Sequence, residues 1–351
     1  MDATQTLKPS EIFEFILNVA PIRPIFIWGP PGIGKSSLVE QFAKEVGLDC
    51  VSMLGSQLAP EDIIGVPQIV DGKSRFCPPT LIARDKPFCL FLDELNACSQ
   101  EVQKAFYSLI NDHRIGEYEL PEGSIVIGAG NRVQDAAIVK PLSSALINRM
   151  VHVSLKANSK DWLNWAHSNG INQLVIDYIV LRPDHLWSKP PAHEEPFSTP
   201  RSWHMLSDAI NAYKQELLGE QIIDVLASGL LTPNHARQFK AFFKQKAHTF
   251  TLSAILKGEK SWPDKPEERD VLYFMVQSLR AQLIKTLPEN KKKLNTKSQE
   301  LVMRSKDLLI KLSRISLEMA QLMVTEDEQG NNLPDWFMLE IARDLPRLIG
   351  Q

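Results

Sequence analysis

A glycine-rich segment near the start of the chain carries the residue types that bind phosphate. It runs from Gly29 to Ser36, and its spacing, G-x-x-x-x-G-K-S, is the P-loop pattern. Glycine leaves room for backbone N–H groups to point at phosphate oxygens, and the helix that follows aims its positive end at them. Lys35 would reach the β- and γ-phosphates, and the Ser36 hydroxyl would ligate Mg²⁺. The predicted nucleotide-binding residues are Gly29, Pro30, Pro31, Gly32, Ile33, Gly34, Lys35, Ser36 and Ser37.

The alternative for this segment is a turn rich in glycine and proline that contains a chance Lys-Ser pair. All the fixed positions of the pattern match, and the segment lies between the apolar run Ile25–Trp28 and a helical pattern over 37–46. A P-loop needs this strand–loop–helix context, so the match favours phosphate binding over a simple turn. We therefore predict that the chain binds a nucleoside triphosphate together with Mg²⁺.

Two carboxylates, Asp93 and Glu94, follow the apolar run Phe88–Leu92. A run without polar alternation fits a strand buried on both faces of a parallel sheet, and ligands bind at the carboxyl ends of such strands. Asp93 would then hold Mg²⁺, directly or through water, and Glu94 would orient or deprotonate the attacking water. The alternative is a strand that ends at an acidic helix N-terminus. The phosphate-binding pattern upstream favours the catalytic interpretation.

Two further polar residues end predicted elements and are candidates for the same chemistry. Asn131 follows the buried strand pattern 124–130, where it could contact the γ-phosphate and the attacking water, although Gly-Asn is also ordinary turn chemistry. Arg149 ends the helical pattern 142–149. It either stabilises a helix C-terminus or projects into the nucleotide site of a neighbouring subunit as an arginine finger.

Arg201 stands where an arginine does not favour a helix. Thr199 is a good N-cap and Pro200 a good first helical residue, so Arg201 falls in the first turn, against the helix dipole. A phosphate partner explains this placement better than helix stability does. The alternative is a solvated arginine at a surface helix start.

Length and composition limit the class of protein. The chain has 351 residues, enough for two or three domains, and a formal net charge of −3, which gives no general footprint for nucleic-acid binding. The four cysteines have no zinc-ligand spacing, and Cys50 and Cys89 lie in apolar runs where buried thiols are expected. No leader pattern opens the chain and no apolar run approaches the roughly 18 residues of a membrane span. We expect a cytoplasmic protein without membrane or nucleic-acid partners.

The remaining patterns arrange these residues. Strand patterns alternate with helical ones as far as the strand 151–155, and from Asp161 onward the pattern is helical. An Asp-Gly turn in the segment Pro67–Phe76 predicts a hairpin, and Gly116–Gly123 predicts a second one. The fold class expected is an α/β P-loop NTPase, an αβα sandwich on a five-stranded parallel sheet, followed by an all-α lid and an α-helical C-terminal region.

With these residues in place, the chain resembles AAA+ ATPases of the MoxR family over about residues 5–245. The matching motifs are Gly29–Ser36, Phe88–Glu94 with its continuation Leu95–Cys98, Ala129–Arg132 and Ala145–Met150. The family has an aromatic residue where this chain has Met150, a mild departure. The resemblance implies that ATP is the nucleotide, that Asn131 is sensor 1, that Arg149 acts in trans and that Arg201 is sensor 2.

The resemblance also implies an organisation and a partner. Residues 1–156 would form the AAA+ core with a helix-2 insert near 60–77, residues 157–248 the lid, and residues 249–351 a helical extension. Family members form ring oligomers, usually hexamers, that remodel client proteins, often with a von Willebrand factor A domain protein. The C-terminal helices would either pack onto the lid or dock a partner.

Two other functions stay open at this stage. One is an ATP-gated binding module with negligible turnover, which the intact Glu94 argues against because such a module has no need of it. The other is the motor subunit of a restriction or defence complex, and the acidic net charge argues mildly against direct nucleic-acid contact. The function predicted is Mg²⁺-dependent ATP hydrolysis in a ring that remodels or activates a partner protein.

Overall fold

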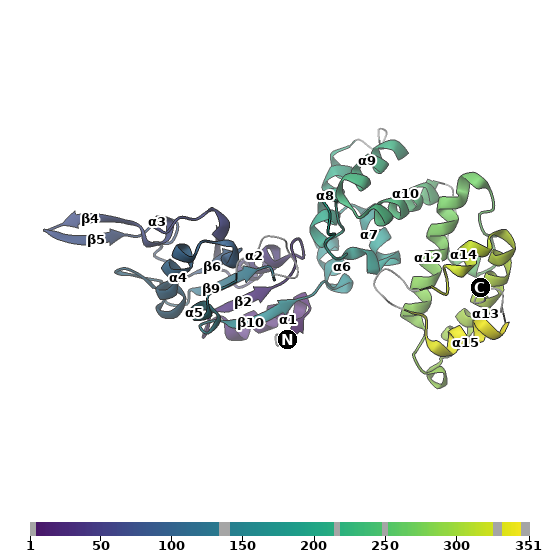
Figure 1. The fold of residues 1–351 in the computed structure, drawn as a ribbon, viewed down its shortest axis with the longest axis horizontal. Coiled ribbons are helices and arrows are strands. Elements are labelled where there is room, and N and C mark those ends of the chain that lie inside the picture. The colour runs from purple at the N-terminus through teal and green to yellow at the C-terminus, as the bar shows by residue number, and fades with distance from the viewer. Residues whose placement is uncertain (1–4, 133–140, 214–217, 248–251, 326–331, 345–351) are drawn as a thin grey trace. The chain divides into compact units, whose positions relative to one another are not determined.

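The computed structural model describes residues 5–132, 141–213, 218–247, 252–325 and 332–344, and the chain divides into two compact units between Trp162 and Leu163 (Figure 1). The first unit is built on a parallel sheet in the order β1-β10-β2-β9-β6-β3. Its strands are β1 Thr6–Leu7, β2 Ile25–Trp28, β3 Asp49–Leu54, β6 Phe88–Asp93, β9 Ile125–Gly130 and β10 Val151–Leu155.

The sheet has six strands, one more than the sequence predicted. The additional strand is β1 at the edge, which pairs with β10 through Thr6↔Ser154 and Leu7↔Leu155. Two residues are too few to leave a periodic pattern, so pairing along the edge of β10 creates this strand rather than its own sequence. The other five strands lie where the apolar runs predicted them.

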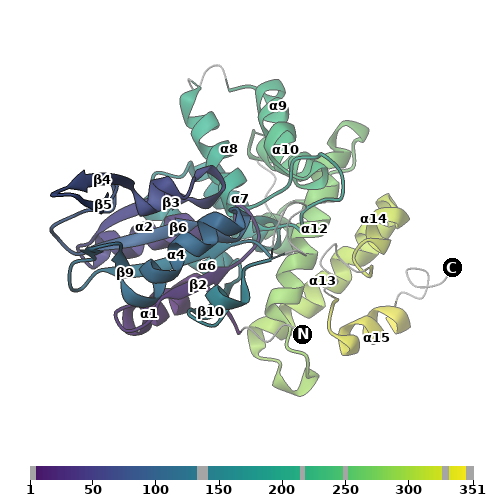
Figure 2. The same ribbon diagram turned by 60° about the vertical axis from the view of Figure 1, so that its left-hand side comes forward.

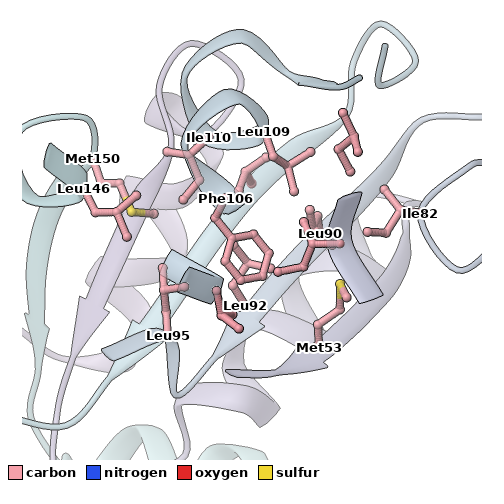
Figure 3. Close-up of a cluster of buried hydrophobic side chains, with 14 of the residues drawn as sticks. Met53, Ile82, Leu90, Leu92, Leu95, Phe106, Leu109, Ile110, Leu146 and Met150 are labelled. Carbon is pink, nitrogen blue, oxygen red and sulfur yellow. The ribbon is translucent and has the colours of Figure 1, made fainter. Parts of the chain in front are cut away.

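Helices cover both faces of the sheet, which confirms the predicted αβα sandwich. Helices α1 Pro9–Val19 and α2 Lys35–Glu45 pack on one face, and α4 Gln100–Asp112 and α5 Ser144–Ile147 pack on the other. Figure 3 shows Phe106 of α4 lying over Leu90 and Leu92 of β6, all three side chains buried. Since β6 buries side chains on both faces, its sequence has no polar alternation.

Two hairpins extend from the sheet. In the first, β4 Val66–Val70 pairs with β5 Lys73–Cys77 across Asp71-Gly72, which confirms the prediction, since both turn residues have positive φ of 52° and 71°. Figures 1 and 2 show this hairpin projecting from the rest of its unit. Ile69, near its tip, is 84% exposed.

The second hairpin differs from the prediction in where it turns. Strands β7 Arg114–Ile115 and β8 Tyr118–Glu119 pair across Gly116-Glu117, so the first strand precedes the predicted segment. Gly116 is the turn residue of this hairpin, with φ of 56°, whereas Gly123 belongs to a separate turn that leads into β9. A second hairpin is therefore present, but it spans 114–119 instead of the predicted 116–123.

The described residues of the second unit form helices and no strand, as the helical patterns after Asp161 predicted. Helix α6 Ser159–Ser168 leads from the first unit into the second. The first unit also contains one short helix not yet named, α3 Glu61–Ile64. The helices that follow are α7 Gln173–Leu181, α8 Pro200–Ala212, α9 Glu220–Leu230, α10 Pro233–Ala247, α11 Leu252–Leu256, α12 Arg269–Thr286, α13 Thr296–Ile315, α14 Leu317–Gln321 and α15 Asp335–Asp344. The last of these helices, α15, ends at Asp344, and residues 345–351 lie outside the described residues.

An aromatic cluster joins helices α7 and α10 to α12 within the second unit. The ring of Tyr178 on α7 lies 5.1 Å from Phe239 of α10 and 5.9 Å from Phe274 of α12, between ring centroids. Since Phe274 is itself 1% exposed, α12 contributes to the same core as α7 and α10.

None of the helices within the described residues combines the length and apolarity of a membrane span.

A group of polar side chains is buried beside this aromatic cluster. The Tyr178 hydroxyl and His185 Nδ1 are 2.7 Å apart, and the ring of His185 stacks on His235 at 3.8 Å between centroids. Arg182 donates to both carboxylate oxygens of Asp184, at 3.1 and 2.6 Å. We name Tyr178, Arg182, Asp184, His185 and His235 the buried polar cluster.

Candidate active site

The predicted phosphate-binding segment forms the loop between β2 and α2. Gly32 and Gly34 have φ of 74° and 102°, a backbone conformation that only glycine adopts readily, and Gly34 is the N-cap of α2. Within the described part of the chain, no group accepts a hydrogen bond from the backbone amides of Gly32, Ile33 or Gly34. Amide donors at a helix N-terminus suit an anion such as phosphate.

Lys35 is the first residue of α2, directly after the loop, and is 8% exposed. Its Nζ donates to the carbonyl oxygens of Gly29 and Pro30 at 2.7 and 3.1 Å, and to Asn131 Oδ1 at 2.8 Å. Since β2 and β9 are neighbours in the sheet, the residues that follow them meet at its carboxyl edge. The structure therefore brings together Lys35 and Asn131, which the sequence separates by 96 positions.

Ser36 and Asp93 also meet at this edge. The Ser36 hydroxyl donates to Asp93 Oδ2 at 2.6 Å, and Asp93 Oδ1 accepts from the backbone amide of Glu94 at 2.9 Å. Hydroxyl and carboxylate oxygens this close fit two positions on one Mg²⁺ ion, which prefers oxygen ligands. The donor set thus fits the metal that the sequence predicted, and within the described residues no group of three or more His, Cys, Asp or Glu side chains could hold a metal ion.

Glu94 has a strained backbone, with φ of 52°. Its side chain does not join Lys35 or Asp93, because Glu94 Oε2 accepts a hydrogen bond from the Ser56 hydroxyl at 2.9 Å. Ser56 follows β3, the neighbour of β6, and sequence analysis gave it no role. The available signal was a hydroxyl residue directly after a strand pattern, at the edge where the other candidates were expected.

Asn96 is a second residue that sequence analysis left without a role. It is 3% exposed, and its Nδ2 donates to the backbone carbonyl of Asn131 at 2.7 Å. Gly130 makes room for it, since a Cβ there would lie 2.3 Å from Asn96 Oδ1. Asn96 therefore fixes the backbone that carries the Asn131 side chain toward Lys35.

Arg149 lies apart from this set. Helix α5 ends at Ile147, so Arg149 follows the helix by two residues instead of ending it as predicted. Its guanidinium is exposed, donates to the backbone carbonyl of Ala145 at 2.9 Å and lies 5.5 Å from the ring centroid of Tyr107. Arg132, another cation after β9, donates to the Ser154 hydroxyl.

Arg201 belongs to the second unit and is exposed in the first turn of α8. The predicted cap is present, because Thr199 Oγ1 accepts from the Ser202 amide at 3.1 Å and Pro200 is the first helical residue. The role of Arg201 toward a phosphate stays a prediction.

Part of the chain is similar in sequence to known proteins. Residues 24–150 match the family described as AAA domain (dynein-related subfamily). The chain is 32% identical to midasin of Giardia intestinalis over 193 residues, which cover 51% of this chain and 4% of midasin. It is 29% identical to the proteasome-activating nucleotidase of Methanocaldococcus jannaschii over 149 residues, 38% of this chain and 33% of that protein. The chain thus spans a small part of the midasin sequence and about a third of the nucleotidase.

The likeness to solved structures is more distant. The RuvB Holliday junction branch migration motor of Thermotoga maritima superposes with a TM-score of 0.35 at 15% identity, over 95% of this chain and 87% of that one. NtrX from Brucella abortus superposes with a TM-score of 0.36 at 15% identity, over 71% of this chain and 61% of that one. The match of residues 24–150 to the AAA domain family, together with the geometry of the loop, supports an ATPase.

Proposed function

We propose that this chain hydrolyses ATP with Mg²⁺ in a ring of subunits and uses the energy to remodel a partner protein. The observation that carries the proposal is the convergence of three sequence segments on one edge of the sheet. Lys35 and Ser36 begin α2, Asp93 ends β6 and Asn131 follows β9. The Lys35–Asn131 and Ser36–Asp93 contacts are 2.8 and 2.6 Å.

The roles of the residues follow from their chemistry. The amides of Gly32 to Gly34 and the Lys35 ammonium bind the phosphates, which would replace the oxygens that Lys35 now contacts. Ser36 and Asp93 hold Mg²⁺, which would supply charge neutralisation of the phosphate oxygens. Asn131 donates its amide to the γ-phosphate or the attacking water.

Glu94 orients the attacking water and takes its proton. Its carboxylate now accepts from Ser56, so it must leave that hydroxyl to reach a water near the γ-phosphate. The presence of a general base beside the metal ligand supports turnover over an ATP-gated binding module, which needs only the loop, Lys35 and Ser36.

The ring is supported by the position of Arg149. Its guanidinium is exposed, and among the described residues its partners are a carbonyl oxygen and an aromatic ring, with no carboxylate. An exposed arginine is available to reach the γ-phosphate bound by a neighbouring subunit and stabilise the charge of the transition state. Arg201 would do the same from the lid, and so couple hydrolysis to movement of the second unit.

The assembly and its partner follow from the MoxR resemblance. That resemblance suggests a hexamer with a chaperone-like activity toward a von Willebrand factor A domain protein and its client. The similarity to the proteasome-activating nucleotidase, a protein named for activating another protein, is in line with a protein client.

The test measures ATP hydrolysis across a range of protein concentrations. The samples are wild type, Arg149→Ala, Lys35→Ala and a mixture of the two variants, with Lys44→Ala, an exposed cation on α2, as the matched control. We expect a specific rate that rises with concentration and loss of activity in each of the two variants. Their mixture should recover part of the activity, because some interfaces then pair an intact Lys35 with an intact Arg149.

Two outcomes contradict the proposal in different ways. Activity that is independent of concentration and insensitive to Arg149→Ala would remove the ring with a trans arginine. ATP binding without hydrolysis in the wild type would remove the enzyme and leave an ATP-gated binding module.

A further inference from the structure

Two of the four cysteines lie side by side in the sheet of the first unit. Cys50 on β3 and Cys89 on β6 are register partners on adjacent parallel strands. Both side chains lie on the face that α1 and α2 cover, where Cys89 is fully buried and Cys50 is half-buried. The mechanism of ATP hydrolysis uses neither thiol.

The spacing of strands allows these two residues to be linked. Neighbouring strands lie about 4.8 Å apart, and disulfide-linked residues have Cα atoms about 4.4 to 6.8 Å apart. Their Cβ atoms must come within about 4.5 Å, slightly less than the strand spacing. A bridge at this position would therefore keep the fold while it draws β3 toward β6.

The two thiols have different acidities because they interact. A hydrogen bond from the Cys89 thiol lowers the pKa of Cys50. Donating that bond, together with burial, raises the pKa of Cys89. The thiolate is the nucleophile in thiol chemistry, so the half-buried Cys50 is the one to react with an oxidant that enters from solvent.

We propose that Cys50 and Cys89 form a peroxide-responsive dithiol that closes to a reversible disulfide and slows ATP hydrolysis. The Cys50 thiolate sulfur attacks one oxygen of hydrogen peroxide, the O–O bond breaks, and the departing hydroxide takes up a proton to become water. The Cys89 sulfur then attacks the Cys50 sulfenic acid, the S–O bond breaks, and hydroxide leaves as water with the Cys89 proton. Two thiols are oxidised and one peroxide is reduced to two waters.

The bridge would act on the nucleotide site through the two strands that carry it. β6 continues from Cys89 to Asp93, four residues or about 13 Å along the strand. β3 leads from Cys50 to Ser56, which holds the Glu94 carboxylate. Because the bridge draws β3 toward β6, it holds Ser56 on the Glu94 carboxylate and keeps the general base from the attacking water.

The test maps the bridge directly on the full-length chain. The reduced protein is treated with hydrogen peroxide, free thiols are alkylated, and the digest is analysed by mass spectrometry with and without prior dithiothreitol. We expect a Cys50–Cys89 cross-linked peptide that disappears on reduction. Cys77 is the internal control, since it is half-buried as well, and it should remain open to alkylation.

The variants separate a dithiol from single reactive thiols. Cys50→Ser and Cys89→Ser should each abolish the cross-link, whereas Cys77→Ser should leave it unchanged. In wild type, peroxide should lower the ATPase rate at least threefold and dithiothreitol should restore it, and neither effect should occur in Cys50→Ser or Cys89→Ser. A thermal melt of each variant checks that the sheet is intact.

The outcomes distinguish this inference from the proposed function. Oxidation of Cys50 and Cys77 at equal rates without a cross-link would overturn the dithiol. A cross-link that leaves the ATPase rate of the wild type unchanged would overturn the coupling to Glu94. Because the cross-link is read from peptides, an absence of ATPase activity in the reduced protein would count against the proposed function and not against the dithiol.

Discussion

The nucleotide-site residues of the first unit and the buried polar cluster of the second contain similar side chains in opposite settings. Around the loop after β2, Asp93, Glu94 and Asn131 stand at strand ends and are only partly buried. In the buried polar cluster, Tyr178 is fully buried and His185 and His235 are each 3% exposed. A constellation of His, Asp and Arg looks catalytic in isolation, but here Tyr178, Arg182 and both histidines are withdrawn from solvent, and only the Asp184 side chain is partly exposed, at 23%.

The difference shows that accessibility to solvent decides whether a group of polar side chains can bind ligands or only stabilises the fold. Polar groups at the edge of a sheet can exchange their protein partners for ligands, as Lys35 would exchange Asn131 for phosphate. Those in the buried polar cluster are held because leaving one unpaired costs about 1–3 kcal/mol, more when it is charged. Substitutions in the first set should therefore remove activity and spare stability, and substitutions in the second should do the reverse.

The largest effect is expected from Glu94→Gln, which removes the general base and keeps the size of the side chain. The ATPase kcat should fall about a thousandfold, within the range for a lost general base, while the thermal unfolding midpoint changes little. Steady-state ATP hydrolysis and calorimetry measure the two quantities. Glu14→Gln, an exposed carboxylate on α1, is the control that should change neither. An active Glu94→Gln variant would place the base elsewhere.

Arg182→Met tests the buried polar cluster in the same way. Asp184 would lose its bidentate partner and Gln238, which also accepts from Arg182, would lose a donor. We expect the free energy of unfolding of the second unit to fall by about 3 kcal/mol, as for other broken buried pairs. Urea unfolding followed by tryptophan fluorescence measures this loss, with the exposed Arg314→Met as control. An unchanged unfolding midpoint would mean that the cluster contributes no stability.

Acid should weaken the second unit through its two stacked histidines. Burial and the Arg182 charge hold the pKa of His185 well below 6.5 and lower the pKa of His235 to about 4. Below pH 6.5 the unfolded chain therefore binds protons that the folded chain does not. The free energy of unfolding decreases as the pH is lowered from 6.5, until His235 itself is protonated near pH 4. For His235 alone the loss between pH 6.5 and 5 is about 1.6 kcal/mol.

The measurement is urea unfolding of the full chain at several pH values between 7.5 and 5. His235→Asn should flatten the acid slope, because one of the two proton-binding differences is gone. His167→Asn, at an exposed position on α6, should keep the slope of wild type. Equal slopes in all three proteins would exclude His235 as a cause.

The sequence predicted those site residues that a local pattern of residue types identifies. The loop of Lys35 and the pair Asp93-Glu94 have both their residue types and their strand context in consecutive positions, and Asn131 follows a strand directly. Ser56 and the partnership of Cys50 with Cys89 could not be predicted, because they depend on β3 lying beside β6 in the sheet order. Local patterns identify strands but do not state which strands are neighbours.

Asn96 sharpens this contrast, because it is buried like the polar cluster and yet serves the site. It donates to the backbone of Asn131, whose side chain meets Lys35, and it touches neither phosphate nor metal in the proposed mechanism. We expect Asn96→Ala to lower kcat on the order of tenfold through displacement of Asn131, with a smaller effect on KM for ATP. If Asn96 acts only through Asn131, the double variant with Asn131→Ala should be no slower than Asn131→Ala alone. Additive losses in kcat, measured by a double-mutant cycle, would instead give Asn96 a separate role. A fall in the unfolding temperature of Asn96→Ala that accounts for the lost activity would mean that Asn96 only stabilises the fold.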